Sequence, residues 1–365
     1  MINEEKDKDF ARISEMQDVL LRSRKEVLPS KCWIFVNKTN IDQLKNYGYS
    51  NFKRTLARNY FTWLIPLKRF WRDDQFQFLF SHIPLKSLII NFLRAFRAIF
   101  TKRIKNLSLY RSNSLTITNE KIYLLLFNSF IYNLLSYFIW EYVLRNDENH
   151  ILSKLDEPLE GNPIRLFRKK KLISQDLANS VLEYKSIISH LKSGEIKSIL
   201  ELGSGYGRTA YVFLNLIPNL KYYFVDIPPA LFVAEKYISN QFRNKRIFKF
   251  RKFESFQEIK EEFERSDIAF FLPNQIELLP PKIADLFINI SSLHEMRLDQ
   301  IYFYFDCIDR LIKKYVYIKE WKETKVPLDD IIITEKDYPI RENWEKIYWR
   351  ECRVKTEFFE ALFQV

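Results

Sequence analysis

Hydrophobic positions follow two different patterns along the chain, and the change falls near residue 173. Up to that point apolar residues recur mostly at helical spacing, as in residues 92–100, which predicts a mostly helical first half. The most apolar window, residues 122–144, is long enough to span a bilayer but contains Asn128, Asn133 and Glu141. Because polar groups at mid-span are costly, we expect a buried helix there rather than a membrane anchor.

Short apolar runs alternate with helical segments in the second half. Strands are expected at residues 197–202, 221–226, 268–272, 286–290 and 315–319. Helices are expected at residues 208–216, 230–240 and 299–313, and the tail from 344 to 365 is rich in β-formers and predicts an antiparallel pair. Strands that alternate with helices predict an α/β fold with a doubly wound, mainly parallel sheet.

A run of turn-forming residues separates the two halves. Two prolines, a glycine and an asparagine fall within residues 156–163, and Ser174 then fits the N-cap of a helix. We therefore expect a mostly helical, basic and aromatic-rich domain at residues 1–157, a linker at 158–173 and an α/β domain at 174–365.

Positive charge is concentrated in the first half. The net charge is +12, and residues 51–110 hold twelve Lys or Arg against Asp73 and Asp74, while a second basic cluster falls within residues 165–171. Basic residues mixed with aromatic ones, as in residues 67–72, fit an anionic membrane, a phosphate-bearing substrate, nucleic acid or a solvated face. No nucleic-acid module matches the pattern, so nucleic acid is not an expected partner, and a peripheral membrane contact stays open.

The cysteines and the first nine residues indicate where in the cell the protein is expected. Cys32, Cys307 and Cys352 are far apart and odd in number, which argues against a disulfide framework and against a zinc site. Residues 1–9 are charged and lack the apolar core of a signal peptide. We expect a cytoplasmic protein, and a position at the inner face of the membrane stays open.

Half of the six glycines fall within five residues, at Gly203, Gly205 and Gly207. They follow an apolar strand-like run and precede a helix, with Ser204 among them. Glycine reaches positive φ and lets a ligand approach where a Cβ would block it. A strand, a glycine loop and a helix N-terminus together predict a nucleotide-type binding corner.

The glycine spacing bears on which nucleotide is bound. A dinucleotide fingerprint needs its third glycine at position 208, which is Arg208, and no Gly-Lys-Ser/Thr of a phosphate loop follows. The spacing Glu201-x-Gly203-x-Gly205-x-Gly207 resembles motif I of class I S-adenosylmethionine-dependent methyltransferases. The resemblance implies S-adenosyl-L-methionine as cofactor. A carboxylate at Glu201 suits the ammonium of that cofactor better than it suits a phosphate.

Other candidate cofactor contacts follow the later strands. Asp226 ends the second strand, where an acid accepts hydrogen bonds from ribose hydroxyls, and Ile227 comes directly after it. An N-cap of the next helix is the alternative role for Asp226. Asn274 follows the third strand, where many methyltransferases place a polar side chain near the adenine, and Ser291 follows the fourth.

Several segments together resemble the sugar O-methyltransferases of bacterial polysaccharide clusters. The segments are residues 51–56, 161–163, 173–184, 201–208, 225–231 and 289–296. The sequences Asp-Ile-Pro-Pro and Ser-Ser-Leu-His-Glu-Met are more specific to this group than the glycine motif. The resemblance implies a Rossmann-like methyltransferase domain and an enzyme that methylates a sugar hydroxyl in surface polysaccharide biosynthesis. It also implies a sugar or glycan substrate, either free or linked to a nucleotide or a lipid.

Methyl transfer to an alcohol calls for a general base, because the hydroxyl loses its proton as the new bond forms. The segment after the strand at 286–290 lies where such sheets place their chemistry, and it offers His294 and Glu295. His294 has the pKa range of a base, and Glu295 can orient the imidazole, hold a substrate hydroxyl or act as the base itself. The alternative is a structural role for both residues at a helix start.

No metal is expected. In the second half the adjacent acid pairs are Asp329-Asp330 and Glu261-Glu262, and the first follows Pro327 in what looks like a solvated loop.

Three other functions stay open at this point. The chain could methylate a lipid or a small metabolite, with the basic first half as a lipid-facing surface. It could be a non-catalytic protein that keeps a cofactor-type fold. An NAD-dependent enzyme is the least favoured, because Arg208 and Glu201 do not suit a dinucleotide.

Overall fold

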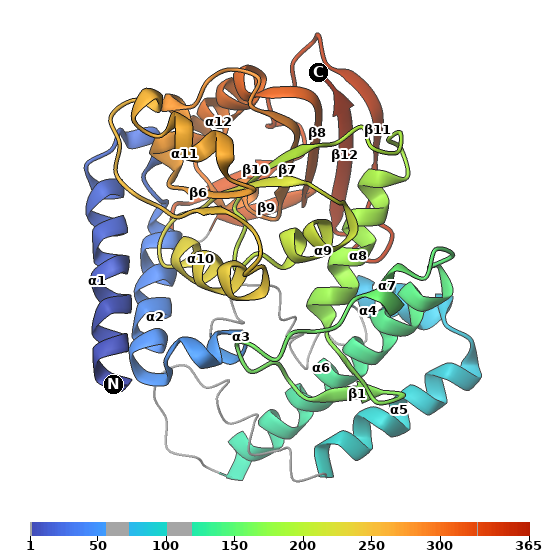
Figure 1. Cartoon of the computed structure of the whole chain (residues 1–365). Helices are drawn as coiled ribbons and strands as arrows, with labels where there is room; N and C mark the ends of the chain where they lie inside the picture. Colours follow the sequence, from blue (N-terminus) through green and yellow to red (C-terminus); the bar gives the residue numbers. More distant parts are fainter. Residues whose placement is uncertain (1, 56–72, 101–118, 327) are drawn as a thin grey trace. The chain divides into compact units, whose positions relative to one another are not determined.

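The computed structural model describes residues 2–55, 73–100, 119–326 and 328–365, which fall into two compact units (Figure 1). The first unit comprises Met1–Lys38, Ser186–Cys352 and Glu357–Val365, and the second comprises Thr39–Lys185 and Arg353–Thr356. The basic and aromatic segment at residues 67–72 lies outside the described residues.

The first unit is built on an eight-stranded sheet with the order β11-β12-β8-β7-β3-β4-β6-β5. Its strands are β3 (Ser198–Leu202), β4 (Lys221–Val225), β5 (Ile247–Phe248), β6 (Ile268–Phe271), β7 (Ala284–Ile290), β8 (Ile312–Trp321), β11 (Glu345–Glu351) and β12 (Phe358–Gln364). The six from β8 to β5 are parallel, β12 is antiparallel to β8, and β11 is antiparallel to β12. The predicted α/β class and the terminal antiparallel pair are therefore confirmed.

Helices cover both faces of this sheet, as a doubly wound fold requires. Tyr222 and Tyr223 are neighbours on β4, so their side chains point to opposite faces. The ring of Tyr222 lies 6.5 Å from that of Phe213 on α9 (Arg208–Leu216), and α10 (Ala230–Gln241) packs on the same face. The ring of Tyr223 lies 5.0 Å from that of Phe263 on α11 (Lys260–Arg265), and α12 (Leu298–Leu311) joins the same buried cluster.

The central strands match the sequence-based expectations closely because they are buried on both faces. All five residues of β3 and all seven of β7 are buried, which is why they appear in the sequence as continuous apolar runs. Strand β8 begins directly after α12, so the helix expected at 299–313 ends at Leu311 instead. Strand β5, helix α11 and the hairpin of β9 (Glu323–Val326) and β10 (Ile331–Thr334) were not predicted from the sequence.

The N-terminal residues belong to the first unit. Helix α1 (Ile2–Leu21), a 3-10 turn (Lys25–Val27) and the start of α2 (Lys31–Tyr47) pack on the α/β fold. Asp9 pairs with Lys236 at 2.9 Å, and Arg12 pairs with Glu235 at 3.3 Å, both on α10. The division into compact units thus differs from the expected division at residue 157. Whether the expected domains act as functional domains stays a prediction.

The second unit is mainly helical. Besides the rest of α2 it holds α3 (Phe52–Thr55), α4 (Asp74–His82), α5 (Leu85–Phe100), α6 (Asn119–Arg145), α7 (Ile151–Lys154), the hairpin of β1 (Leu166–Arg168) and β2 (Lys171–Ile173), and most of α8 (Gln175–Ile188). Ser174 caps α8 as expected, since its hydroxyl accepts a hydrogen bond from the Leu177 amide at 3.0 Å. Residues 131–143 of α6 are all buried, as expected for a core helix. None of the helices in the described parts of the chain has the length and hydropathy needed to cross a bilayer.

A buried polar cluster joins three separate segments of the second unit. Lys53 and Glu157 form an ion pair at 2.5 Å in which the side chains are 4% and 3% exposed. The Ser174 hydroxyl donates to the other oxygen of Glu157 at 2.6 Å, and Arg54 Nε donates to the Asn162 carbonyl at 2.6 Å. The segments at 51–56, 161–163 and 173–184 are therefore brought together by charged and polar contacts that sequence spacing does not show.

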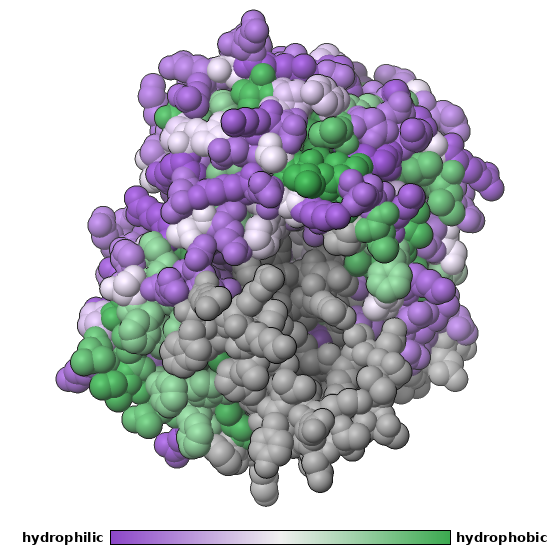
Figure 2. All heavy atoms as spheres, turned by 180° about the vertical axis from the view of Figure 1, so that it is seen from behind, coloured by the Kyte–Doolittle hydropathy of each residue, from purple (hydrophilic) through white to green (hydrophobic). Residues whose placement is uncertain are grey.

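Helix α5 is buried on one side only. Leu88, Ala95 and Ile99 are buried, and α5 packs on α6. Its opposite side stays exposed, and Figure 2 shows hydrophobic side chains gathered on the surface where α5 lies.

Candidate functional site

The glycine loop joins β3 to α9, and all three of its glycines have positive φ: 72° at Gly203, 57° at Gly205 and 90° at Gly207. A Cβ on Gly203 would lie 2.2 Å from the hydroxyl oxygen of Ser292, so this position has no room for another residue. Glycine is therefore required here both by backbone conformation and by close packing against the loop that follows β7.

Asp226 stands directly after β4 and faces the glycine loop. Its carboxylate accepts hydrogen bonds from the Gly205 and Ile227 amides, each at 2.7 Å. Burial raises the pKa of Asp226 to about 7; the two amide bonds oppose that shift and the charge of Glu295 adds to it. The N-cap of α10 is Pro229, so Asp226 does not cap that helix.

Glu201 lies on β3 two residues before the loop and is 2% exposed. The Tyr222 hydroxyl of the neighbouring strand donates to Glu201 at 2.8 Å. A buried carboxylate at the carboxyl end of a central strand is an attractive partner for a ligand cation, because the low dielectric strengthens the interaction.

Two buried oxygens in this region have no hydrogen-bond partner among the described residues. They are the Ser204 hydroxyl oxygen and the Asn274 side-chain carbonyl oxygen. Asn274 lies in the 3-10 turn that follows β6, at the same edge of the sheet as Asp226. Buried polar atoms are normally paired, so unpaired ones at the carboxyl ends of the strands fit a ligand that supplies the missing donors.

The segment after β7 is held by Glu320, a residue that the sequence pattern does not single out. Glu320 on β8 is fully buried, and its carboxylate accepts hydrogen bonds from the amides of Ser292, Leu293 and His294 at 3.2–3.3 Å. The same carboxylate contacts the imidazole Nδ1 of His294 at 2.5 Å. Glu320 follows the predicted strand by one residue, so its position in the sequence gave no reason to link it with His294.

Aromatic rings enclose the imidazole. The ring of His294 is 6.2 Å from that of Trp321 and 6.3 Å from that of Phe358, and the residue is 4% exposed. A proton on Nδ1 satisfies the contact with Glu320, which leaves Nε2 as the basic nitrogen. Glu320 thus holds the imidazole through Nδ1, and the roles considered for Glu295 stay predictions.

Glu295 lies on the other side of the imidazole, with its carboxylate 3.8 Å from His294 Nε2. Burial raises the pKa of Glu295 and the charge of Glu320 adds to the shift, whereas His294 and a hydrogen bond from Trp33 oppose it. The side chain is 35% exposed, so solvent still reaches this carboxyl. Its backbone carbonyl accepts from the Ser30 hydroxyl at 3.1 Å.

Asn289 joins the glycine loop to the His294 segment. Its side-chain amide donates to the Leu202 carbonyl at 2.8 Å, and its side-chain oxygen accepts from the Leu293 amide at 3.3 Å. Together with the Gly203–Ser292 packing, this places both loops at the carboxyl ends of β3 and β7. The chain changes sides of the sheet between these two strands, which is where doubly wound folds bind ligands.

The structure brings most of the expected site residues to one edge of the sheet. Glu201, Ser204 and the glycines follow or end β3, Asp226 and Ile227 follow β4, and Ser291, His294 and Glu295 follow β7. Ser291 sits at φ 56°, and its amide donates to the Lys319 carbonyl at 2.8 Å. Their roles in binding and catalysis stay predictions.

Metal ligation has no candidate in the described part of the chain, where no three His, Cys, Asp or Glu lie close enough to hold an ion. Asp329 accepts hydrogen bonds from the Lys31 and Cys32 amides at the start of α2, at 3.2 and 3.1 Å, and Asp330 pairs with Lys325 at 2.7 Å.

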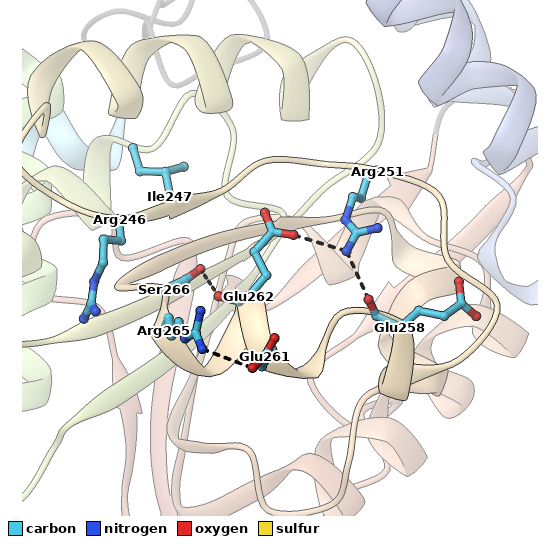
Figure 3. Close-up of a pocket in the computed structure, with 8 residues that line it drawn as sticks. All are labelled: Arg246, Ile247, Arg251, Glu258, Glu261, Glu262, Arg265 and Ser266. Carbon is cyan, nitrogen blue, oxygen red and sulfur yellow. Dashed lines mark hydrogen bonds and ion pairs between the residues drawn. The ribbon is translucent and has the colours of Figure 1, made fainter.

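An open pocket of about 400 Å³ lies elsewhere, between β5 and α11 (Figure 3). It is lined by three Arg and three Glu, and four of them pair within it: Arg251 with Glu262 and Arg265 with Glu261, each at 3.1 Å. These contacts leave little net charge to attract a ligand, so we assign no function to this pocket.

No protein-family model and no curated protein matches this sequence. Similar solved structures include an S-adenosylmethionine-dependent methyltransferase from Aquifex aeolicus, with 15% identity, 59% of this chain and 96% of that chain covered, and a TM-score of 0.33. The N-methyltransferase NodS from Bradyrhizobium japonicum, in complex with S-adenosyl-L-homocysteine, has 12% identity, 51% and 85% coverage and a TM-score of 0.34. The 1,6-didemethyltoxoflavin N1-methyltransferase from Burkholderia thailandensis has 13% identity, 52% and 78% coverage and a TM-score of 0.34.

At these identities and TM-scores the comparisons do not carry an activity over to this chain. The class is defined by the chain's own topology: a Rossmann-like, doubly wound α/β fold with a helical N-terminal region. The loop with Gly203, Gly205 and Gly207, called the glycine corner below, lies at the carboxyl ends of β3 and β7, where the chain changes sides of the sheet.

Proposed function

We propose that the chain is an S-adenosyl-L-methionine-dependent O-methyltransferase that methylates a sugar hydroxyl in bacterial surface polysaccharide biosynthesis. One observation carries the proposal: a glycine corner flanked by buried carboxylates is fixed, through Asn289 and Ser292, beside a buried His–Glu pair. The glycine corner and its carboxylates suit the methyl donor, and the His–Glu pair suits removal of a proton from an alcohol.

The residues at the corner fit the donor. Glu201 would face the ammonium of its amino-acid tail, Asp226 would accept from the ribose hydroxyls, and Asn274 would lie near the adenine. The unpaired oxygens of Ser204 and Asn274 and the desolvated carboxyl of Asp226 all gain from a ligand with donors at these positions. The bound cofactor supplies an electrophilic methyl group.

The chain's own residues supply the proton chemistry. His294 takes the hydroxyl proton at Nε2, and Glu320 stabilises the imidazolium through Nδ1–H. Glu295, 3.8 Å from Nε2, holds the acceptor hydroxyl close to the base. A general base of this kind accounts for about 10²–10⁴ in rate.

The sugar acceptor rests on the resemblance of residues 225–231 and 289–296 to sugar O-methyltransferases. Whether the glycan is free, nucleotide-linked or lipid-linked is addressed by the choice of substrates. Purified protein is incubated with methyl-labelled S-adenosylmethionine and, in turn, nucleotide sugars, lipid-linked saccharides and small phenols. Label in a glycan supports the proposal; transfer only to phenols or free lipids replaces the sugar with another acceptor.

Donor binding is tested separately by titration calorimetry. We expect S-adenosylmethionine to bind, Gly205→Arg to abolish binding by filling the corner, and nicotinamide dinucleotides not to bind. An unmodified protein that binds no S-adenosylmethionine would contradict the enzyme assignment as a whole. Donor binding without transfer to any acceptor would favour a non-catalytic binding protein.

A further inference from the structure

Helix α5 exposes a row of large apolar side chains. They are Leu85 (70% exposed), Ile89 (53%), Phe92 (49%), Leu93 (61%) and Phe96 (50%). Steps of three and four residues place them along one side of the helix. The buried residues of α5 are different ones, namely Leu88, Ala95 and Ile99, although Phe92 also contacts Phe130 on α6 with 5.1 Å between the ring centroids. A contiguous exposed apolar face of this kind marks an interaction surface.

The charged residues of α5 have one sign. Helix α5 carries Lys86, Arg94 and Arg97 and no acidic residue, and Lys86 and Arg97 are exposed. In the sequence no Asp or Glu occurs between Asp74 and Glu120, whereas seven Lys or Arg do. An apolar face on a helix whose charged residues are all cations complements a surface that is negatively charged outside and apolar beneath.

We propose that α5 lies on an anionic lipid bilayer, with this row at the boundary between headgroups and acyl chains. At 16 residues the helix is shorter than the roughly 20 that crossing a bilayer requires, so it lies in the plane of the surface. A second copy of the chain is the less suitable occupant, because a two-fold contact through this row would bring the cations of the two helices, Lys86 and Arg97, near one another with no acid on the helix to pair with them.

The test is co-sedimentation of the full chain with vesicles of phosphatidylcholine, with and without phosphatidylglycerol. We expect binding to the anionic vesicles that weakens as salt is raised. The variant Ile89→Ser/Leu93→Ser should bind about tenfold more weakly or worse, because apolar area is lost. The variant Lys86→Gln/Arg97→Gln should lose a similar factor in affinity, but for the anionic vesicles alone.

The matched control removes apolar side chains of equal exposure from the first unit. Tyr302→Ser/Ile332→Ser, at 54% and 58% exposed, should bind vesicles like the unmodified chain. Light scattering is run in parallel. Equal binding by the Ile89/Leu93 variant, no binding by the unmodified chain, or a dimer that this variant splits would each overturn the proposal.

Discussion

His294 Nδ1 lies 2.5 Å from the carboxylate of Glu320, which is fully buried on β8. The same carboxylate accepts three backbone amides from residues 292–294, so one side chain fixes both the loop and the imidazole. Glu320 is thus a positioning residue for the base that we propose.

Replacing this carboxylate should slow methyl transfer without removing donor binding. Glu320→Gln places an amide against Nδ1, which disfavours the imidazolium, and we expect kcat to fall about 10²–10⁴-fold. The KM for S-adenosylmethionine should stay close to that of the unmodified enzyme, whereas a purely structural defect would raise it as well. Glu323→Gln, on the exposed strand β9, is the control and should behave like the unmodified enzyme. A Glu320→Gln enzyme that binds the donor and keeps full rate would contradict the positioning role of Glu320.

Replacing Gly203 should be destabilising, because the side chain of Ser292 occupies the space that a Cβ would need. Gly203→Ala places a Cβ 2.2 Å from the Ser292 oxygen at a φ of 72°, and we expect about 2–4 kcal/mol of destabilisation together with loss of donor binding. Chemical denaturation measures the first effect and calorimetry the second.

Two further variants separate packing from backbone strain at Gly203. Gly194→Ala has a similar φ of 75° but open space around it, so it should lose only about 1 kcal/mol. Gly203→Ala/Ser292→Gly relieves the clash and should regain most of the difference. If the double variant is as unstable as Gly203→Ala alone, Ser292 is not the obstacle.

Donor affinity should depend on pH through Asp226. With a pKa of about 7, the Asp226 carboxyl is partly protonated at neutral pH in the ligand-free protein. The ribose hydroxyls need the ionised carboxylate as hydrogen-bond acceptor. We expect the affinity for S-adenosylhomocysteine to fall by up to about tenfold per unit as pH drops below 7. Asp226→Asn should bind weakly and without this slope, and Glu295→Gln should move the midpoint to lower pH because a repelling charge is gone.

The same carboxyl affects the stability of the ligand-free protein. Because its pKa is raised in the folded state, the proton is held more tightly there, and the Asp226 contribution is greatest in acid and is lost as pH rises through about 7. The unfolding free energy is measured against pH without ligand for the unmodified protein and for Asp226→Asn. The same pH dependence in both would contradict this contribution of Asp226.

The buried ion pair of the second unit should be costly to break from one side. Lys53→Met leaves the Glu157 carboxylate buried without its cation, and we expect about 3–5 kcal/mol of destabilisation by chemical denaturation. Lys53→Met/Glu157→Leu should lose less than Lys53→Met alone, since no uncompensated charge remains. Arg265→Gln is the control, because its pair with Glu261 is 70% and 85% exposed and should matter by less than about 0.5 kcal/mol.

The sequence by itself determined the α/β order and the position of the glycine corner. Strands such as β3 and β7 are buried on both faces, so they stand out as apolar runs, and Gly203 and Asp226 lie beside strand ends where local spacing is informative. Short edge elements were missed because β5 spans only two residues and has little apolar pattern to read.

Only the tertiary structure decided which side chains meet. Glu320 reaches His294 across 26 positions, Ser292 fills the space that Gly203 leaves open, and Lys53 pairs with Glu157 over 104 positions. It also decided that α1 packs on the α/β unit and that α5 keeps its apolar row exposed. Periodicity shows which face of an element is apolar; which neighbour covers that face depends on contacts between residues far apart in the chain.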